Sequence, residues 1–244
     1  MSDKNSDLSL CAGHRERLRQ NFLDDKLAKY ETLELLLSYA IPRRDVRPLA
    51  RMLYNKFGGM YPILSASIDD LCRIRGMGRN TAIFIKVVQK ILLDGYEHKF
   101  KDSQVLHDRE QLANFCKLQL GNKYVEEVRI LYLDDMGRLL ENQLHSTGTY
   151  DRSSLYDVEI VKYALSLGAK GVVLVHNHPR PDTSFSDQDI QITLRLKNML
   201  NAVGINLIDH YLVSGDMLYT MSEFHIYTNG IHHTNGDTGT PNKS

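Results

Sequence analysis

The sequence predicts a chain of two parts, a small all-α domain followed by a mixed α/β domain. Two observations support this division. Apolar residues recur at helical spacing up to about residue 93, whereas beyond residue 105 short apolar runs typical of strands alternate with helical segments. The polar run at 97–103 separates the two patterns and predicts a linker near residue 100. We therefore expect a helical domain over 1–100 and an α/β domain over 105–227.

The first part contains helical patterns only. They cover His14–Phe22, Tyr30–Tyr39, Pro48–Phe57, Ile68–Ile74 and Asn80–Leu93. Ser67 has the side chain of an N-cap, and the pair Gly58-Gly59 is typical of a helix end. These segments predict a small helical bundle.

Beyond the linker the apolar pattern changes to that of a sheet with helices. Strands are expected at Val128–Leu133, Leu139–His145, Gly171–His176, Ile205–Val213 and Met217–Met221, and helices near 109–119, at Val158–Leu167 and at Asp187–Ala202. The tail at 228–244 is rich in Asn, Gly, Thr and Lys, so we expect it to be disordered.

Composition excludes several classes of protein. No stretch approaches the roughly 18 apolar residues of a membrane helix, and the polar N-terminus lacks the apolar core of a secretory signal, so we expect a soluble, cytoplasmic protein without membrane contact. The three cysteines, Cys11, Cys72 and Cys116, are too few and too far apart for a disulfide framework or a cysteine-based zinc site. Any metal ion must therefore bind to histidines and carboxylates.

Charge is unevenly distributed although the net charge is zero. Residues 1–100 carry 17 Lys or Arg against 12 Asp or Glu, and the remainder carries 13 against 18. The basic excess permits contacts with a nucleic-acid backbone, but solvated surface helices often show as much.

A candidate metal site follows the apolar run that starts at Gly171. His176 and His178 stand two residues apart at the end of this strand, so their rings point to the same face. Asp189 lies at the start of the next helix. Two imidazoles and one carboxylate leave a fourth tetrahedral position open, as in catalytic zinc sites. The sequence thus predicts one zinc ion per chain on these three residues.

A simpler interpretation exists for the same residues. Ser186 followed by Asp189 also fits an N-cap with an acidic partner three residues on, as in a capping box, and the two histidines would then form ordinary hydrogen bonds in a loop. The two interpretations are compatible in part, because a carboxylate in the first helical turn points back toward the preceding loop.

The spacing of His176, His178, Ser186 and Asp189 resembles the zinc motif of the JAMM (MPN-type) metallopeptidases, and the chain as a whole resembles the bacterial RadC family. The matching segments include Gly13–Arg19, Glu34–Leu37, Ile41–Val46, Gly76–Gly78, Gly148-Thr149, Leu174–Pro179 and Asp209–Gly215. This resemblance implies a helix-hairpin-helix-like domain followed by an MPN α/β domain.

The resemblance also implies roles for individual residues. His176, His178 and Asp189 would bind zinc, and Ser186 would stabilise the oxyanion formed when activated water attacks a carbonyl. Family members usually place a general base, a Glu, where this chain has Gln143, which cannot accept a proton. Glu141 lies on the same strand face two residues earlier, about 6.6 Å away, and is our candidate base; otherwise it is an ordinary strand residue.

Two further segments bear on function. The loop after His178 departs from the usual family sequence, and Arg180 and Phe185 are expected to change which substrate can approach. Gly76 and Gly78, with Arg79, resemble the hairpin of DNA-binding helix-hairpin-helix modules, although such glycines also form simple tight helix connections.

Asp209-His210 lies at a strand end and, with no third ligand nearby, is expected to support the zinc ligands or to form ordinary hydrogen bonds. His232 and His233 fall in the tail and are expected to have no specific role.

Three functions remain after exclusion of other zinc hydrolases. The sequence has neither the H-E-x-x-H helix of zincins nor the P-C-x-x-C segment of nucleobase deaminases. The leading hypothesis is a zinc-dependent hydrolase in which metal-activated water attacks a peptide or isopeptide carbonyl of an unidentified peptide or protein substrate. The alternatives are a DNA-associated protein, including a metal-dependent nuclease linked to DNA repair, and a pseudoenzyme that keeps zinc for folding or partner binding.

Overall fold

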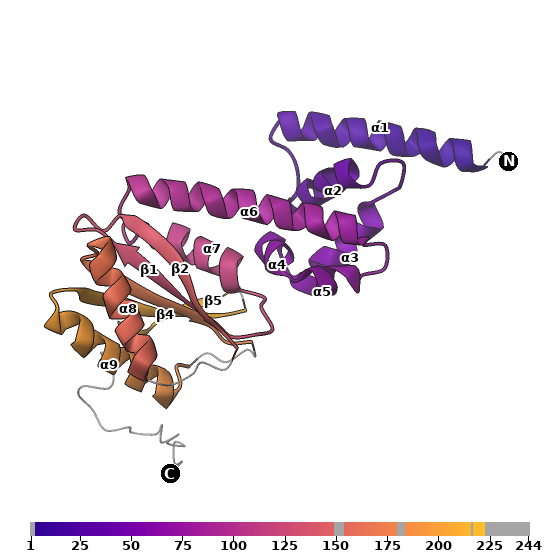
Figure 1. Ribbon diagram of the computed structural model, residues 1–244. Coiled ribbons are helices and arrows are strands. Elements are labelled where there is room, and N and C mark those ends of the chain that lie inside the picture. Colours follow the sequence, from indigo (N-terminus) through magenta and orange to yellow (C-terminus); the bar gives the residue numbers. More distant parts are fainter. Residues whose placement is uncertain (1–2, 149–153, 180–183, 216, 223–244) are drawn as a thin grey trace, which may run out of the picture.

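The computed structural model describes residues 3–148, 154–179, 184–215 and 217–222. The described helices are α1 (Asp3–Leu23), α2 (Lys29–Ala40), α3 (Arg47–Phe57), α4 (Met60–Ser65), α5 (Ile68–Cys72), α6 (Arg79–Asp102), α7 (Arg109–Leu120), α8 (Ser154–Leu167) and α9 (Asp187–Ala202). The described strands are β1 (Glu127–Leu133), β2 (Leu139–Thr147), β3 (Gly171–Asn177), β4 (Asn206–Ser214) and β5 (Met217–Thr220). The chain is thus helical up to α7 and then mixed (Figure 1).

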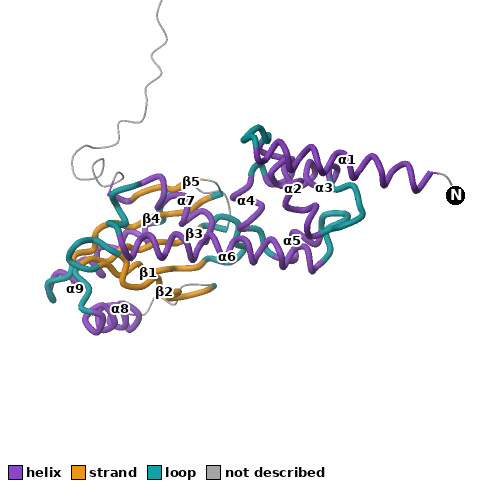
Figure 2. The backbone as a smooth tube through the Cα atoms, turned by 90° about the horizontal axis from the view of Figure 1, so that it is seen from above, coloured by secondary structure: helices purple, strands orange, loops and turns teal. Residues whose placement is uncertain are grey.

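The strands form one sheet in the order β2-β1-β3-β4-β5. β3 pairs antiparallel with β1 and parallel with β4, so it lies at the centre and all seven of its residues are buried. Helices α6 and α7 cover one face of the sheet, and α8 and α9 cover the other (Figures 1 and 2). The mixed α/β architecture expected from the sequence is confirmed.

The helical part has its own apolar core. Leu33, Leu53, Ile63 and Ile85 are fully buried there, contributed by α2, α3, α4 and α6. The short helix α4 was not predicted from the sequence, in which Gly58-Gly59 indicated only a helix end. Pro62 is tolerated in α4 because it lies in the first helical turn. Among the described helices, none is both long enough and apolar enough to cross a membrane.

Helix α6 belongs to both cores. Its N-terminal half contributes Ile85 to the helical core, and its C-terminal half places Phe100 against Phe115 of α7, with ring centroids 5.4 Å apart. The polar run expected to be a linker is therefore largely the exposed side of a continuous helix that ends at Asp102. The two parts are connected by this helix and by α7, whose Leu118 also packs into the helical core.

Truncation of Phe100 tests this shared helix. Phe100→Ala should lower the free energy of unfolding by about 3–5 kcal/mol, because the side chain is 2% exposed and leaves a cavity beneath the sheet. The measurement is a urea titration, with Val87→Ala on the exposed side of α6 as the matched control, expected within about 0.5 kcal/mol of the unmutated protein. Equal losses of stability from Phe100→Ala and Val87→Ala would contradict the conclusion that the C-terminal half of α6 packs in the core beneath the sheet.

Candidate metal centre

Three side chains converge at the end of β3. The His176 and His178 Nε2 atoms are 3.1 Å apart, and the Asp189 oxygens lie 3.6 Å from His176 Nε2 and 3.7 Å from His178 Nε2. Two ligand atoms that share a tetrahedral zinc ion at about 2.1 Å are about 3.4 Å from each other. The structure therefore brings together the three side chains named from the sequence, and their chemistry and spacing could hold one metal ion.

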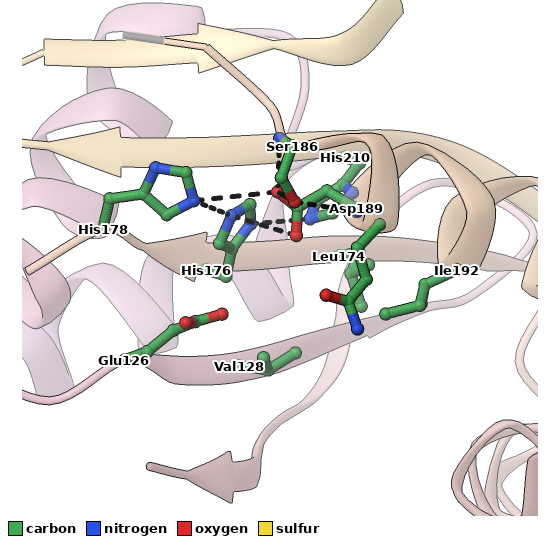
Figure 3. Close-up of a pocket in the computed structure, with 10 residues that line it drawn as sticks. Glu126, Val128, Leu174, His176, His178, Ser186, Asp189, Ile192 and His210 are labelled. Carbon is green, nitrogen blue, oxygen red and sulfur yellow. Dashed lines mark hydrogen bonds and ion pairs between the residues drawn. The ribbon is translucent and has the colours of Figure 1, made fainter. Parts of the chain in front are cut away.

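Strand alternation explains the positions of the two histidines. His176 and His178 both point into the cavity beside the start of α9 (Figure 3), and alternation along the strand turns the Asn177 side chain between them to the opposite face. The His178 backbone N–H donates to the Val213 carbonyl of β4, 3.0 Å away, so the segment stays in the sheet beyond the last strand residue. The sheet thus fixes both rings at the C-terminal end of its central strand.

Asp189 reaches the histidines from the first turn of α9. The Ser186 backbone N–H and hydroxyl both donate to Asp189 Oδ2, at 2.8 and 2.6 Å, and Ser186 Oγ accepts from the Asp189 N–H at 3.2 Å. This is the capping box considered as the simpler interpretation of the sequence. Because both Ser186 donors engage Oδ2, the cap also orients the carboxylate and leaves Oδ1 facing His176.

A chain of hydrogen bonds continues behind His176. The Thr193 hydroxyl donates to the Asp189 carbonyl, so its oxygen accepts from His210 Nδ1 at 2.7 Å. His210 Nε2 then accepts from His176 Nδ1, also at 2.7 Å. This assignment of donors and acceptors leaves the lone pair of His176 on Nε2, the atom that faces His178 and Asp189. The sequence did not include His210 among the site residues, and Asp209 beside it accepts hydrogen bonds from Ser222 instead.

The electrostatics of the cluster suit a cation. Burial lowers the pKa of His176 to about 4 and the pKa of His210 well below its usual value, so both rings are neutral near pH 7. Burial alone raises the pKa of Asp189, but hydrogen bonds from His178 and Ser186, with the nearby His176, hold it well below its usual range. A neutral His176 imidazole and an ionised Asp189 carboxylate that face one point, together with the second imidazole of His178, form a ligand set for a divalent metal ion.

A further carboxylate, Glu126, faces the same cavity. Glu126 immediately precedes β1, and its side chain extends into the cavity below His176 and His178 (Figure 3). Sequence reasoning missed this residue. Its location follows from the pairing of Val128 with His176, because residues two apart on a strand share a face, and this pairing is known only from the structure.

Asn177 fixes the backbone on both sides of Glu126. Its buried side chain accepts from the Glu127 N–H at 2.9 Å and donates to the carbonyls of Val125 at 3.3 Å and Lys123 at 3.5 Å. The residue between the two histidines therefore holds the segment that carries the carboxylate.

Glu141 and Gln143 occupy a different part of the sheet. Glu141 accepts a hydrogen bond from Tyr163 of α8 at 2.7 Å, and Gln143 accepts one from Tyr132 at 3.0 Å. Neither residue lines the cavity that contains the histidines. The structure thus does not bring the sequence-predicted base to the cluster, because β1 separates β2 from β3.

The loop that departs from the family sequence is described in part. Arg180 lies outside the described residues. Phe185 is buried, with its ring centroid 5.9 Å from His176 and 5.2 Å from His210, and it packs with Leu212 and Met221. It packs against the His176 and His210 rings and does not line the cavity, so its predicted influence on substrate stays a prediction.

The predicted DNA-contacting residues belong to the helical part. Gly76 and Gly78 lie in the turn between α5 and α6, and Arg79 is the first residue of α6. Gly76 has a φ of +96°, and a Cβ atom there would lie 2.5 Å from the Arg44 guanidinium. Arg44 therefore packs on a turn that requires glycine.

Comparisons with known proteins place the chain in a family. Residues 106–226 match a family model described as a RadC-like JAB domain. A UPF0758 protein of Fusobacterium nucleatum is 34% identical over 221 residues, which cover 86% of this chain and 95% of the relative. A UPF0758 protein of Ruegeria pomeroyi is 34% identical over 208 residues, 84% of this chain and 93% of the relative. These names state no activity.

The hydrogen-bond chain behind His176 leads to a prediction on metal affinity. Thr193→Val and His210→Ala should each weaken zinc binding about 10- to 100-fold, because both remove a group that orients His176. Competition with a chromophoric chelator measures the dissociation constant. Thr32→Val, an exposed position on α2, is the matched control and should bind zinc like the unmutated protein. Unchanged zinc affinity in both Thr193→Val and His210→Ala would show that the hydrogen bonds behind His176 do not contribute to metal binding.

Proposed function

Since this chain belongs to the RadC family, we propose that it is a zinc-dependent hydrolase that cleaves a peptide or isopeptide bond. The observation that carries the proposal is the convergence of His176, His178 and Asp189 on one cavity that Glu126 also faces. Three ligands that leave a coordination position open beside a carboxylate form the arrangement of catalytic rather than structural zinc sites.

Each residue has a defined task in this proposal. His176, His178 and Asp189 would hold the zinc ion, which supplies Lewis acidity that polarises a carbonyl and allows water to lose a proton near pH 7. Glu126 accepts that proton and passes it to the leaving amine. The Ser186 hydroxyl donates to the developing oxyanion after turning away from Asp189 Oδ2, which it binds in the resting structure.

The choice of Glu126 as base is tested against Glu141. Glu126→Gln should lower the rate of amide cleavage by about 10²- to 10⁴-fold with its zinc retained, because the amide keeps the shape and cannot accept a proton. Glu141→Gln should cleave normally, because Glu141 does not line the cavity. The readout is the rate at which new N-termini form in a proteome-derived peptide library, followed by mass spectrometry.

The same cleavage assay also tests the metal requirement and distinguishes the alternative assignments of the base. His176→Ala should contain no zinc and cleave nothing. Normal cleavage by Glu126→Gln would overturn the assigned base, and loss of activity in Glu141→Gln alone would restore the sequence-based assignment. A zinc-containing protein in which neither Glu126→Gln nor Glu141→Gln changes any cleavage would be a pseudoenzyme.

DNA association is a second candidate, supported by the turn between α5 and α6. Within the described residues, no side chain caps the N-terminus of α6 at Gly78, and the flanking Arg75 and Arg79 are exposed. Backbone N–H groups at a helix N-terminus, together with arginines, are suited to binding a phosphate of the DNA backbone.

Salt dependence tests this second candidate. Arg79→Ala should weaken binding to duplex DNA and reduce the slope of log affinity against log salt by about 0.9, because one phosphate contact is lost. Fluorescence anisotropy at several salt concentrations gives the slope. Lys170→Ala, an exposed position in the α/β part, is the control. The candidate fails if DNA does not bind, or if Arg79→Ala and Lys170→Ala behave alike.

A further inference from the structure

The cavity next to the histidines has an apolar end. Its volume is about 300 Å³, and Val128, Leu174 and Ile192 line it together with the metal-binding side chains and Glu126. We propose that this end is a subsite for an aliphatic side chain of about four or five carbons, on the residue whose carbonyl is attacked. The inference rests on the proposed function and specifies its substrate class.

The walls of the subsite come from three elements. Leu174 shares a face of β3 with His176, two residues further into the sheet, a distance of about 6.6 Å. Val128 lies opposite His176 on β1, and Ile192 follows Asp189 by three residues on α9, so it shares a helix face with that ligand. The apolar surface therefore lies directly beside the metal-binding side chains, on three neighbouring elements.

The position of Glu126 indicates whether the acyl side or the amine side of the cleaved bond lies at the apolar end of the cavity. In Figure 3 the Glu126 side chain enters the cavity from the His178 side and ends below His176, whereas Leu174 and Ile192 lie on the other side of His176. The carboxylate that takes the proton from water must also deliver it to the leaving nitrogen, so the amine side lies near Glu126. The acyl side then points toward Leu174 and Ile192.

The chemistry of the walls selects an uncharged acyl residue. Val128, Leu174 and Ile192 are each no more than 7% exposed and offer no hydrogen-bonding group, and Gln188, which also lines the cavity, carries an uncharged amide. A charged side chain placed against these walls would lose its hydration without gaining an opposite charge from them, whereas each buried methylene gains from leaving water. The subsite should therefore bind Leu- or Met-like side chains and reject Asp, Glu, Lys and Arg.

Alkyl hydroxamates test the subsite without requiring turnover. The hydroxamate group binds the zinc ion in place of the attacked carbonyl, and its alkyl tail takes the place of the acyl side chain. For the zinc-loaded full chain, affinity should rise about three- to fourfold per methylene from acetohydroxamate to hexanohydroxamate and then level off by decanohydroxamate. Isothermal titration calorimetry measures each dissociation constant.

A matched pair of substitutions locates the tail. Ile192→Phe fills the apolar end, so the ratio of hexanohydroxamate to acetohydroxamate affinity should fall to about one. Ile83→Phe makes the same change on the exposed side of α6 and should keep the full ratio. If Ile192→Phe does not fold, as judged by circular dichroism, the tail series on the unmutated chain still tests the subsite.

The outcomes separate this inference from the proposed function. Tight acetohydroxamate binding with no gain from longer tails would overturn the subsite and leave the zinc site intact. Absence of acetohydroxamate binding by zinc-loaded protein would contradict the open coordination position of the proposed function, and the subsite would fall with it. A tail gain that survives Ile192→Phe would place the tail elsewhere and overturn the inference.

Discussion

Burial of the His176 imidazole is the constraint on which the site depends. The side chain is 1% exposed at the end of a strand that has neighbours on both sides, so neither ring nitrogen can turn to bulk water for a partner. His210 satisfies Nδ1, and Thr193 and the Asp189 carbonyl fix His210 in turn. The remaining nitrogen must then face His178 and Asp189. In this structure His178 Nε2 is its hydrogen-bond partner, 3.1 Å away, and the zinc ion of the proposed function would take that place.

The same residues serve the fold and the site at once. Ser186 and Asp189 start α9 as a capping box, and that cap also orients the carboxylate toward the histidines. Ile192, one turn later, packs in the core between the sheet and its helices and also lines the cavity. Because helix start, ligand and cavity wall lie within two turns of one helix, a change in the position of α9 would move all three together.

Much of this arrangement follows from the sequence, and what does not has physical reasons. Alternation on a buried strand was enough to pair His176 with His178, and the helix start was enough to add Asp189. Glu126 was missed because a carboxylate just before a strand has no periodic signal; its proximity to His176 arises only from the pairing of β1 with β3. The continuity of α6 was missed for a related reason, since its last turns are polar except for Phe100, which packs beneath the sheet.

Asn177 couples two parts of the site that local unfolding would otherwise separate. Its side chain holds the segment of Glu126, while its neighbours in the chain are the two histidines. Fraying of this short segment would release both imidazoles and the carboxylate in one event. Partial opening would therefore abolish the site cooperatively, so a population of molecules would contain intact and inactive forms without partly functional intermediates.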